Sequence, residues 1–514
     1  MKTIVPTLPQ AAEVIVVGGG TCGAVIAARL AERGLDVLVL EAGPDPGAYG
    51  DPRWPADLLD ATRLPTSHDW GFDSRDTYAD RVVPFERAKV IGGCSTHNGA
   101  VQTWGHRLDY DGWAALGNPG WSTEALRPLF ERASAQLRVR TYAVDELTPW
   151  QRAWYEAGPE VGLPQLADLN DFDETVGIAP ESVNIVDGGV RWNSAFAYLD
   201  PLRGRAHLRI VGDVLVDRVL FEHGRAAGVS VVHGGVTRQI RSPCVVLASG
   251  SYGTPAVLLR SGVGPAADLD ALRIPRVQHL PGVGAGLHDQ PFIMMRWAGS
   301  DAMRETMLAA EARGWTPDEQ AMAKAASSLE REAFDLHILP YSPTHLFGTR
   351  TWHAGVGALC PRSRGRVWLT SRDPAVLPSV DHAFLSDPEG HDVRVLLDGI
   401  ALLREMAARP KMAALLGREL RPGPEAGATA QALAAFLKQN PNSYWHPVGS
   451  CRMGPATDPS AVVDAGGAVH GLDGCHVADC SIMPFVPRAT TAMPAVVIAE
   501  RVAEALLARR PGSS

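Results

Sequence analysis

Short apolar runs set the pattern of the first part of the chain. Residues 14–17 (VIVV) and residues 37–40 (VLVL) are apolar without interruption, which is typical of strands buried on both faces of a parallel sheet. Between these runs, apolar residues recur at helical spacing over residues 24–31. The pattern therefore predicts a strand, a helix and a second strand within residues 13–43.

Later stretches extend this pattern. Residues 244–250 (CVVLASG) have the pattern of a strand that runs into a glycine turn, and we expect it to join the same sheet. A further strand is predicted from Val211 to Val216. Residues 300–333 show a helical and charged pattern, so we expect this segment to form part of a lid or an interface.

The first predicted strand ends in a glycine motif, Gly18-x-Gly20-x-x-Gly23. Gly18 permits a tight turn, Gly20 lets the backbone approach a pyrophosphate, and Gly23 lets the helix pack close to the strand. The helix start offers free N–H groups to phosphates, and Glu41 at the end of the second strand can accept hydrogen bonds from ribose hydroxyls. These features predict dinucleotide binding, but the motif does not distinguish FAD from NAD.

The composition excludes several kinds of partner. The 514 residues carry a net charge of −9, and no nucleic-acid partner is expected because phosphate binding needs a basic face. No apolar stretch approaches the roughly 20 residues that span a bilayer, and the N-terminus lacks a secretory signal pattern. The seven cysteines are scattered without a CxxC pair, which indicates reduced thiols in a cytoplasmic protein rather than disulfides or a metal site.

A second glycine-rich stretch, residues 87–105 (RAKVIGGCSTHNGAVQTWG), resembles the first signature of the glucose–methanol–choline (GMC) flavoprotein oxidoreductase family. Cys94 stands in a small-residue position and His97 in an aliphatic position. Both departures look like the choline-oxidase branch, in which a histidine ring nitrogen is bonded to the 8α-methyl carbon of the flavin. The resemblance implies that His97 tethers FAD, since a neutral imidazole is a nucleophile. The alternative is a histidine that only packs against, or hydrogen-bonds to, a non-covalent flavin.

The resemblance covers nearly the whole chain. Residues 250–264 (GSYGTPAVLLRSGVG) resemble the family's second signature, and residues 281–291 resemble its loop between domains. The implied fold is α/β (α+β overall), with a Rossmann-like FAD-binding domain and a discontinuous substrate-binding domain built on an antiparallel sheet with flanking helices. The expected FAD-binding segments are 1–155, 190–290 and 441–514, the last with the active-site loop, and the expected substrate-domain segments are 156–189 and 291–440.

Residues 443–454 (SYWHPVGSCRMG) resemble the family's active-site loop, whose histidine faces the flavin. That histidine is His446, and Pro447 restricts its backbone to extended geometry. The implied reaction begins when His446 takes the hydroxyl proton of a small alcohol. The carbon then gives hydride to flavin N5, which yields an aldehyde or ketone. The electrons pass to O2 and give H2O2 in an oxidase, or to another acceptor in a dehydrogenase.

The family's second active-site His or Asn corresponds to Thr490, which is a departure. A threonine hydroxyl does not titrate near neutral pH, although it can hydrogen-bond to the substrate oxygen. Either Thr490 is a working substitute beside a lone base, or the correspondence is displaced by one or two residues, or the activity is altered. Asp479 resembles the family's flavin-contacting acid, and its alternative role is a helix or turn cap.

Two other functions stay open. One is a hydroxynitrile-lyase-like enzyme that keeps FAD without net redox chemistry, and the other is a non-catalytic flavoprotein, which the intact His446 loop argues against. The sequence determines neither the alcohol nor the oligomeric state. The catalytic candidates are His446 and Thr490. The residues expected to bind FAD are Gly18, Gly20, Thr21, Cys22, Gly23, Glu41, Ala42, Gly92, Gly93, Ser95, His97, Asn98, Gly99, Ala100, Val214, Ser249, Gly250, Asp479, Thr491, Ala492 and Met493.

Overall fold

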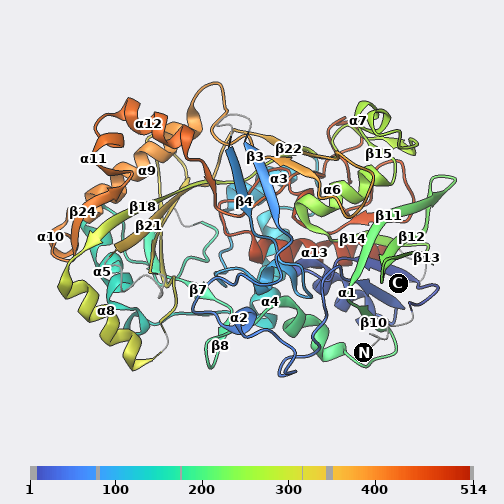
Figure 1. Ribbon diagram of the computed structural model, residues 1–514, viewed down its shortest axis with the longest axis horizontal. Helices are drawn as coiled ribbons and strands as arrows, with labels where there is room; N and C mark the ends of the chain where they lie inside the picture. The colour runs from blue at the N-terminus through green and yellow to red at the C-terminus, as the bar shows by residue number, and fades with distance from the viewer. Residues whose placement is uncertain (1–7, 77–80, 174–175, 315, 343–350, 510–514) are drawn as a thin grey trace.

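A five-stranded parallel sheet forms the centre of one lobe of the protein (Figure 1, right). The computed structural model describes residues 8–76, 81–173, 176–314, 316–342 and 351–509. The strand order of this sheet is β10-β2-β1-β14-β26. The bounds of its strands are β1 (Val14–Val17), β2 (Val37–Leu40), β10 (Leu208–Val211), β14 (Val245–Leu247) and β26 (Cys475–Val477).

The apolar runs at residues 14–17 and 37–40 are confirmed as buried neighbouring strands of this sheet. The strand predicted from Val211 to Val216 is wrong in extent. The chain leaves the sheet after Val211, turns through Asp213 with a positive φ of 58°, and begins β11 (Val214–Glu222) in a separate sheet. That sheet is a meander completed by β12 (Arg225–His233) and β13 (Val236–Arg241).

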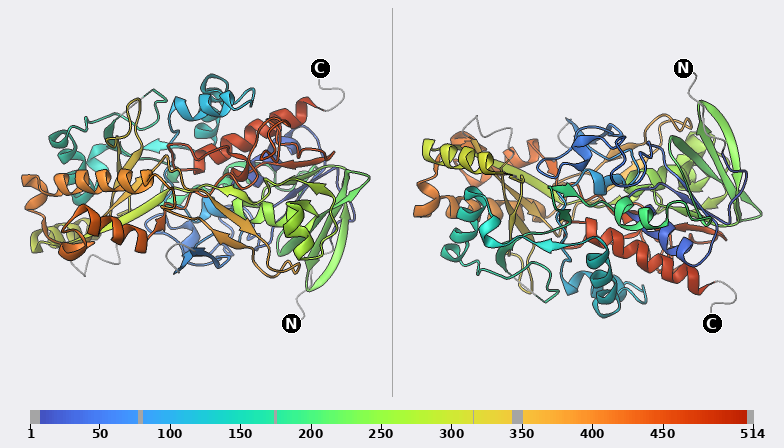
Figure 2. Two further views of the ribbon diagram at one scale, coloured as in Figure 1. Left: turned by 90° about the horizontal axis from the view of Figure 1, so that it is seen from above. Right: turned by 90° about the horizontal axis from the view of Figure 1, so that it is seen from below.

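Helices cover the parallel sheet and tie the distant ends of the chain together. Helix α1 (Thr21–Glu32) follows β1, and α13 (Ala492–Ala508) packs beside it along the same lobe (Figure 2, blue and red). The other elements of this lobe and its flanks are α2 (Ala56–Leu59), β3 (Phe72–Asp76), β4 (Arg81–Phe85), α3 (Arg107–Ala115), α4 (Thr123–Gln136), α6 (Gly250–Arg260) and α7 (Ala266–Ala271).

The second lobe is built on an antiparallel sheet with the strand order β24-β18-β21-β20-β19-β6 (Figure 1, left). The bounds of these strands are β6 (Gly177–Pro180), β18 (Pro291–Gly299), β19 (Ala321–Ala325), β20 (Leu336–Tyr341), β21 (Thr351–Ala358) and β24 (Leu416–Arg421), and β25 (Asn442–Ser443) pairs with β18. The flanking helices include α5 (Pro149–Ala157), α8 (Asp301–Arg313), α9 (His391–Ala407) and α12 (Ala430–Gln439). Together the lobes show the expected α/β fold with a separate antiparallel sheet.

Residues 300–333 are only partly helical. Helix α8 ends at Arg313, and the chain then enters β19, whose five residues are all buried within the antiparallel sheet. The helical pattern expected for this segment is therefore wrong in its second half, because the small apolar residues of β19 fill an inner strand of the sheet. No helix among the described residues is long and apolar enough to cross a bilayer.

The strands of each sheet come from widely separated segments, which supports the division into discontinuous domains. The parallel sheet combines strands near residues 14, 208, 245 and 475, and the antiparallel sheet takes its strands from residues 177–180 and 291–443. Helix α5 crosses the boundary placed at residue 155 and packs against α8 and β19. We therefore propose that the second lobe begins before Pro149.

Glu500 of α13 joins three helical segments of the first lobe. Its fully buried carboxylate accepts hydrogen bonds from Arg29 of α1 at 2.8 Å, from Arg132 of α4 at 2.9 Å and from the Tyr198 hydroxyl at 3.1 Å. We expect Glu500→Ala to lower the free energy of unfolding by about 3 kcal/mol, because the substitution leaves buried donors without an acceptor. Urea denaturation of the holoprotein measures the loss.

Glu504→Ala is the matched control, since Glu504 pairs with the same Arg132 at 3.1 Å but is exposed. Its removal should cost about 1 kcal/mol or less. Equal losses for the two variants would contradict the special role of Glu500.

Candidate active site

A cavity of about 580 Å³ is lined by residues of both lobes. Its walls include Gly18, Gly20 and Glu41 from the parallel-sheet lobe, and Phe292 and Tyr341 from the antiparallel sheet. His446 also lines it. The cavity therefore joins the glycine motif of the first strand to the loop predicted to carry the chemistry.

The glycine motif forms the turn between β1 and α1. Gly18 has a positive φ of 94°, and a Cβ there would lie 2.7 Å from the Ala248 carbonyl oxygen. A Cβ at Gly23 would lie 1.9 Å from the Gly18 oxygen, so this glycine serves helix packing. Helix α1 begins at Thr21 with no side-chain cap at Gly20. Its first N–H groups are therefore available to an anion in the cavity.

Glu41 lines the cavity at the end that contains the glycine motif. Its Oε2 accepts a hydrogen bond from Gly19 N at 2.8 Å, and its Oε1 accepts one from Gly43 N at 2.8 Å. Burial raises the pKa of Glu41 against these bonds, which lower it. Each carboxylate oxygen keeps a lone pair for a ligand hydroxyl, as expected for a ribose-binding acid.

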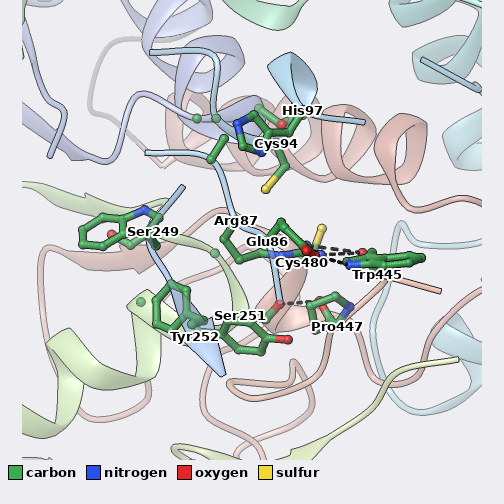
Figure 3. A pocket seen from close by; sticks show the side chains of 18 of the residues that line it. Glu86, Arg87, Cys94, His97, Ser249, Ser251, Tyr252, Trp445, Pro447 and Cys480 are labelled. Carbon is green, nitrogen blue, oxygen red and sulfur yellow. Dashed lines mark hydrogen bonds between the residues drawn. The ribbon is translucent and has the colours of Figure 1, made fainter. Parts of the chain in front are cut away.

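His97 follows the short helix of residues 93–96 and lines the cavity close to Cys94 (Figure 3). Its Nε2 lies 2.6 Å from the Ser67 carbonyl oxygen. A carbonyl only accepts, so Nε2 carries the proton and Nδ1 keeps the lone pair. Burial lowers the pKa of His97, which favours the neutral ring.

The turn that carries His446 is held from several sides. Trp445 has a positive φ of 62°, and its carbonyl oxygen accepts two hydrogen bonds from the Arg87 guanidinium, both at 3.2 Å. The Trp445 indole donates to Glu86, and the Pro447 carbonyl accepts from Ser251 (Figure 3). These contacts fix the loop on both sides of His446.

The His446 ring has a defined tautomer. Its Nδ1 lies 2.6 Å from Gln290 Oε1, and Gln290 Nε2 donates to the Pro487 carbonyl, which identifies the facing amide atom as oxygen. Nδ1 therefore carries the proton, and Nε2 is the basic nitrogen. Burial, and then the Arg87 charge, lower the pKa of His446 to about 3. The backbone N–H of His446 donates to Asp289 at 2.9 Å, and burial raises the pKa of that acid to about 6.

Thr490 lines the same cavity, but its hydroxyl is already engaged. Its Oγ1 donates to the Val101 carbonyl at 3.1 Å and lies 2.9 Å from the Thr103 hydroxyl. The Thr490 backbone N–H donates to the same Thr103 hydroxyl at 2.7 Å. Its hydroxyl proton is thus committed within the protein.

Asp479 is held by hydrogen bonds at the wall of the cavity. It lines the cavity, and its Oδ2 accepts hydrogen bonds from Gly250 N at 2.9 Å and from Thr254 Oγ1 at 2.6 Å. Its Oδ1 accepts from Ser481 N. The side chain therefore caps two helix starts, as the alternative interpretation predicted, while it faces the cavity.

Most residues expected to bind the cofactor line the cavity, and five do not. Gly92 has a positive φ of 86° and Ser95 donates to its carbonyl, so both shape the loop from behind. Met493 is fully buried in the core of α13. The five residues away from the wall are Gly23, Gly92, Ser95, Ala100 and Met493.

Sequence patterns missed the groups that hold or face His446. Its neighbours come from distant segments of the chain: Gln290 accepts from its ring, Asp289 accepts from its backbone N–H, and Arg87 donates to the preceding Trp445 carbonyl. Glu319 lines the cavity from the antiparallel lobe. The one local signal was the stretch HDQP at residues 288–291, where two polar residues precede a strand.

The fold and cavity define a dinucleotide-binding enzyme with its chemistry where two lobes meet. The GMC oxidoreductase family matches residues 12–292 with its N-terminal domain and residues 361–499 with its C-terminal domain. This chain belongs to the GMC oxidoreductase family, and it is an FAD-binding oxidoreductase that acts on the CH–OH group of alcohols.

Similar proteins include oxygen-dependent choline dehydrogenases. The chain is 33% identical to the one from Pseudomonas syringae pv. syringae (strain B728a), over 97% of this chain and 94% of the relative. It is 34% identical to the one from Paraburkholderia phytofirmans, with the same coverage. Pyridoxine 4-oxidase from Mesorbium loti superposes with a TM-score of 0.85 at 27% identity, covering 96% of this chain and 98% of the neighbour. A formate oxidase shares the fold, with a TM-score of 0.86 at 20% identity over 99% of this chain and all of the neighbour's.

The glycine cradle offers a test of how FAD is held. Gly20 has φ −71° and ψ −163°, which alanine also adopts, and a Cβ there would meet only Gly93 Cα at 3.6 Å. We expect Gly20→Ala to fold normally but to retain at least about tenfold less flavin per protein, because the methyl group occupies the space through which the pyrophosphate approaches.

Flavin absorbance per mole of protein and far-UV circular dichroism measure the two effects. Gly417→Ala on the outlying strand β24 is the control and should keep its flavin. Full flavin content in Gly20→Ala would contradict this placement of the pyrophosphate.

Proposed function

We propose that His446 takes the hydroxyl proton of a small alcohol, which is thereby oxidised to an aldehyde or ketone. The observation that carries the proposal is the bond from His446 Nδ1 to Gln290 Oε1, because it leaves Nε2 as an unprotonated base in the cavity. Bound FAD supplies the hydride acceptor at its N5 atom. Glu41, the Gly18–Gly20 turn and the loop around His97 would hold it.

The buried position of His446 suits it to this role. An imidazole with a pKa of about 3 stays neutral at physiological pH, so its Nε2 lone pair is free, but it is a weaker base than a free imidazole. The Arg87 charge that lowers this pKa also favours negative charge on a substrate oxygen beside the ring. His446 and Arg87 thus act together on the alcohol as its proton leaves.

We propose that Thr490 holds part of the active site in place and does not transfer a proton. Because the Thr490 hydroxyl donates its proton to the Val101 carbonyl, we propose that Thr490 fixes the segment before α13. His446 is then the single base of the site. This arrangement supports the first of the interpretations of the missing second histidine.

For the acceptor we propose O2, with H2O2 as the reduced product. The support comes from the similarity of the chain to oxygen-dependent choline dehydrogenases and to a pyridoxine 4-oxidase. A dehydrogenase that uses another acceptor is the second candidate. All seven cysteines are free thiols, which supports a reducing, cytoplasmic compartment.

Substitution of the base tests the function. We expect His446→Gln to lower the rate of anaerobic flavin reduction by an alcohol roughly 10²- to 10⁴-fold, because general-base catalysis contributes about that factor. Stopped-flow absorbance measures the rate, and His279→Gln at an exposed strand residue is the control. Failure of every alcohol to bleach the wild-type flavin would favour a lyase-like function instead.

We further propose that His97 is bonded covalently to the flavin 8α-methyl carbon; the methyl group and the imidazole would each give up one proton, and the two electrons would pass through the flavin to O2. The neutral ring has its Nε2 proton directed to the Ser67 carbonyl, which leaves Nδ1 as the nucleophile. The buried ring lines the cavity, where a bound flavin can reach it.

Acid precipitation tests the bond. Yellow colour should stay in the protein pellet of the wild type and move to the supernatant in His97→Ala. Colour in the supernatant of both proteins would show that FAD is not tethered, and His97 would then only pack against it.

A further inference from the structure

A buried histidine next to the cavity wall has polar partners at both ring nitrogens. His382 follows β23 (Ser379–Asp381) and is 3% exposed. Its ring stacks on Phe85 and on Phe384, with centroid distances of 4.2 and 4.9 Å. Stacking alone would suit a third phenylalanine equally well, so the hydrogen bonds of the imidazole need a reason of their own.

The partners of His382 are a serine of β3, a tyrosine of the cavity wall and a buried acid. Its Nδ1 lies 3.0 Å from the Ser74 hydroxyl. Its Nε2 lies 2.8 Å from the Tyr252 hydroxyl and 3.3 Å from Asp289 Oδ2. Tyr252 lines the cavity (Figure 3), and burial raises its pKa, so its hydroxyl is neutral. His382 therefore joins the cavity wall to Asp289.

Asp289 is the acid that holds the turn around His446. Its Oδ1 accepts backbone hydrogen bonds from Gln290 at 2.8 Å and from His446 at 2.9 Å. Its Oδ2 accepts the Ser443 hydroxyl at 2.6 Å, and Ser443 Oγ accepts the Trp445 N–H at 2.6 Å. One carboxylate thus anchors the chain on both sides of the left-handed residue Trp445. Protonation would take a lone pair from this set of acceptors.

The ionised carboxylate determines the tautomer of His382. A carboxylate oxygen only accepts, so Nε2 carries the proton and shares it between Asp289 and Tyr252. Nδ1 then accepts the Ser74 hydroxyl proton. Burial, and then the Arg87 charge, lower the pKa of His382 to about 3. The ring is therefore a neutral donor to a buried anion.

Asp289 changes its charge near the pH at which enzymes work. Burial raises the pKa of Asp289 to about 6, and the Arg87 charge opposes that rise. Within the described part of the chain, the titratable groups that face the acid are His382, Tyr252 and His446, and all three are neutral near pH 6. A single donor to the carboxylate therefore has a large effect on its ionisation.

We propose that His382 is a positioning residue of the active site, which keeps Asp289 ionised and so holds the turn that presents His446 to the substrate. The proposal rests on the proposed function of His446. Donation from Nε2 stabilises the anion, and the anion accepts the His446 N–H and the Ser443 hydroxyl. When Asp289 takes up a proton, these donors compete with the new O–H, and the strained turn at Trp445 loses part of its anchor.

His382→Phe tests the proposal, since the new ring can keep both stacks but donates no hydrogen bond. The rate of anaerobic flavin reduction by benzyl alcohol, which has no charge of its own to titrate, should fall about tenfold per pH unit below about pH 6 in the wild type. In His382→Phe this low-pH limb should move up by about one pH unit or more, because a hydrogen bond to the anion is lost. His382→Gln keeps an N–H donor and should move the limb back toward that of the wild type.

Tyr252→Phe tests the same network from the cavity side and does not alter the stacked rings of His382. The variant removes the competing acceptor of the Nε2 proton. The whole donation then goes to Asp289, so the limb should move to lower pH. An upward move would contradict the tautomer and with it the proposal.

Two further variants serve as controls. Asp289→Asn should abolish the limb around pH 6, because an amide does not titrate. His476→Phe makes the same substitution at a buried histidine whose charged neighbours are Arg509 and Asp464, and it should leave the limb in place. A limb that stays near pH 6 in His382→Phe, or that moves equally in His476→Phe, would overturn the proposal.

Infrared difference spectra of the holoenzyme follow Asp289 itself and need no substrate. The C=O band of the protonated acid, identified by its absence in Asp289→Asn, should titrate with a midpoint of about pH 6 in the wild type and about one unit higher in His382→Phe. This shift without flavin reduction by any alcohol would support the network and refute the proposed function. An unmoved midpoint with normal flavin reduction would refute the role of His382 and leave the function in place.

Discussion

The turn from Ser443 to Pro447 is the constraint on which the reacting end of the cavity depends. It carries His446 inward through a left-handed conformation at Trp445, with φ of 62°, which costs a bulky residue about 1–2 kcal/mol. Asp289 accepts the His446 N–H, and Arg87 donates twice to the Trp445 carbonyl. Hydrogen bonds to charged groups contribute about 1.5–3 kcal/mol each, so these anchors outweigh the strain.

Burial acts on His446, Asp289 and Glu319 in the same sense, toward the neutral form. It lowers the pKa of His446 to about 3, raises that of Asp289 to about 6 and raises that of Glu319 to about 8. The charge on Arg87 is therefore weakly screened, and it reaches both the base and the substrate oxygen. Burial of this kind keeps the His446 ring neutral.

The sequence predicted those features that depend on local geometry. Uninterrupted apolar runs identified the strands at residues 14–17 and 37–40, and the glycine spacing identified the turn beside the cavity. Thr491 and Ala492 line the cavity while the Met493 side chain is fully buried, because successive residues of a helix are rotated by about 100°; backbone contact of Met493 with the cofactor stays a prediction. The partnership of His446 with Gln290 joins residues 156 positions apart, and no local pattern encodes such a contact.

Thr490 stands where the family has a His or Asn, and a threonine hydroxyl does not titrate near neutral pH. This difference changes which groups near the base can alter their charge with pH. The Thr490 hydroxyl is hydrogen-bonded to the Val101 carbonyl and to the Thr103 hydroxyl. Burial lowers the pKa of the nearby His337 and favours its neutral form. Neither can share a proton with His446 near neutral pH. Burial raises the pKa values of two acids near the base toward this range: Asp289, which accepts the His446 N–H, and Glu319, which lines the cavity. We therefore expect the pH response of this site to come from its carboxylates, since the low pKa of His446 keeps that ring neutral.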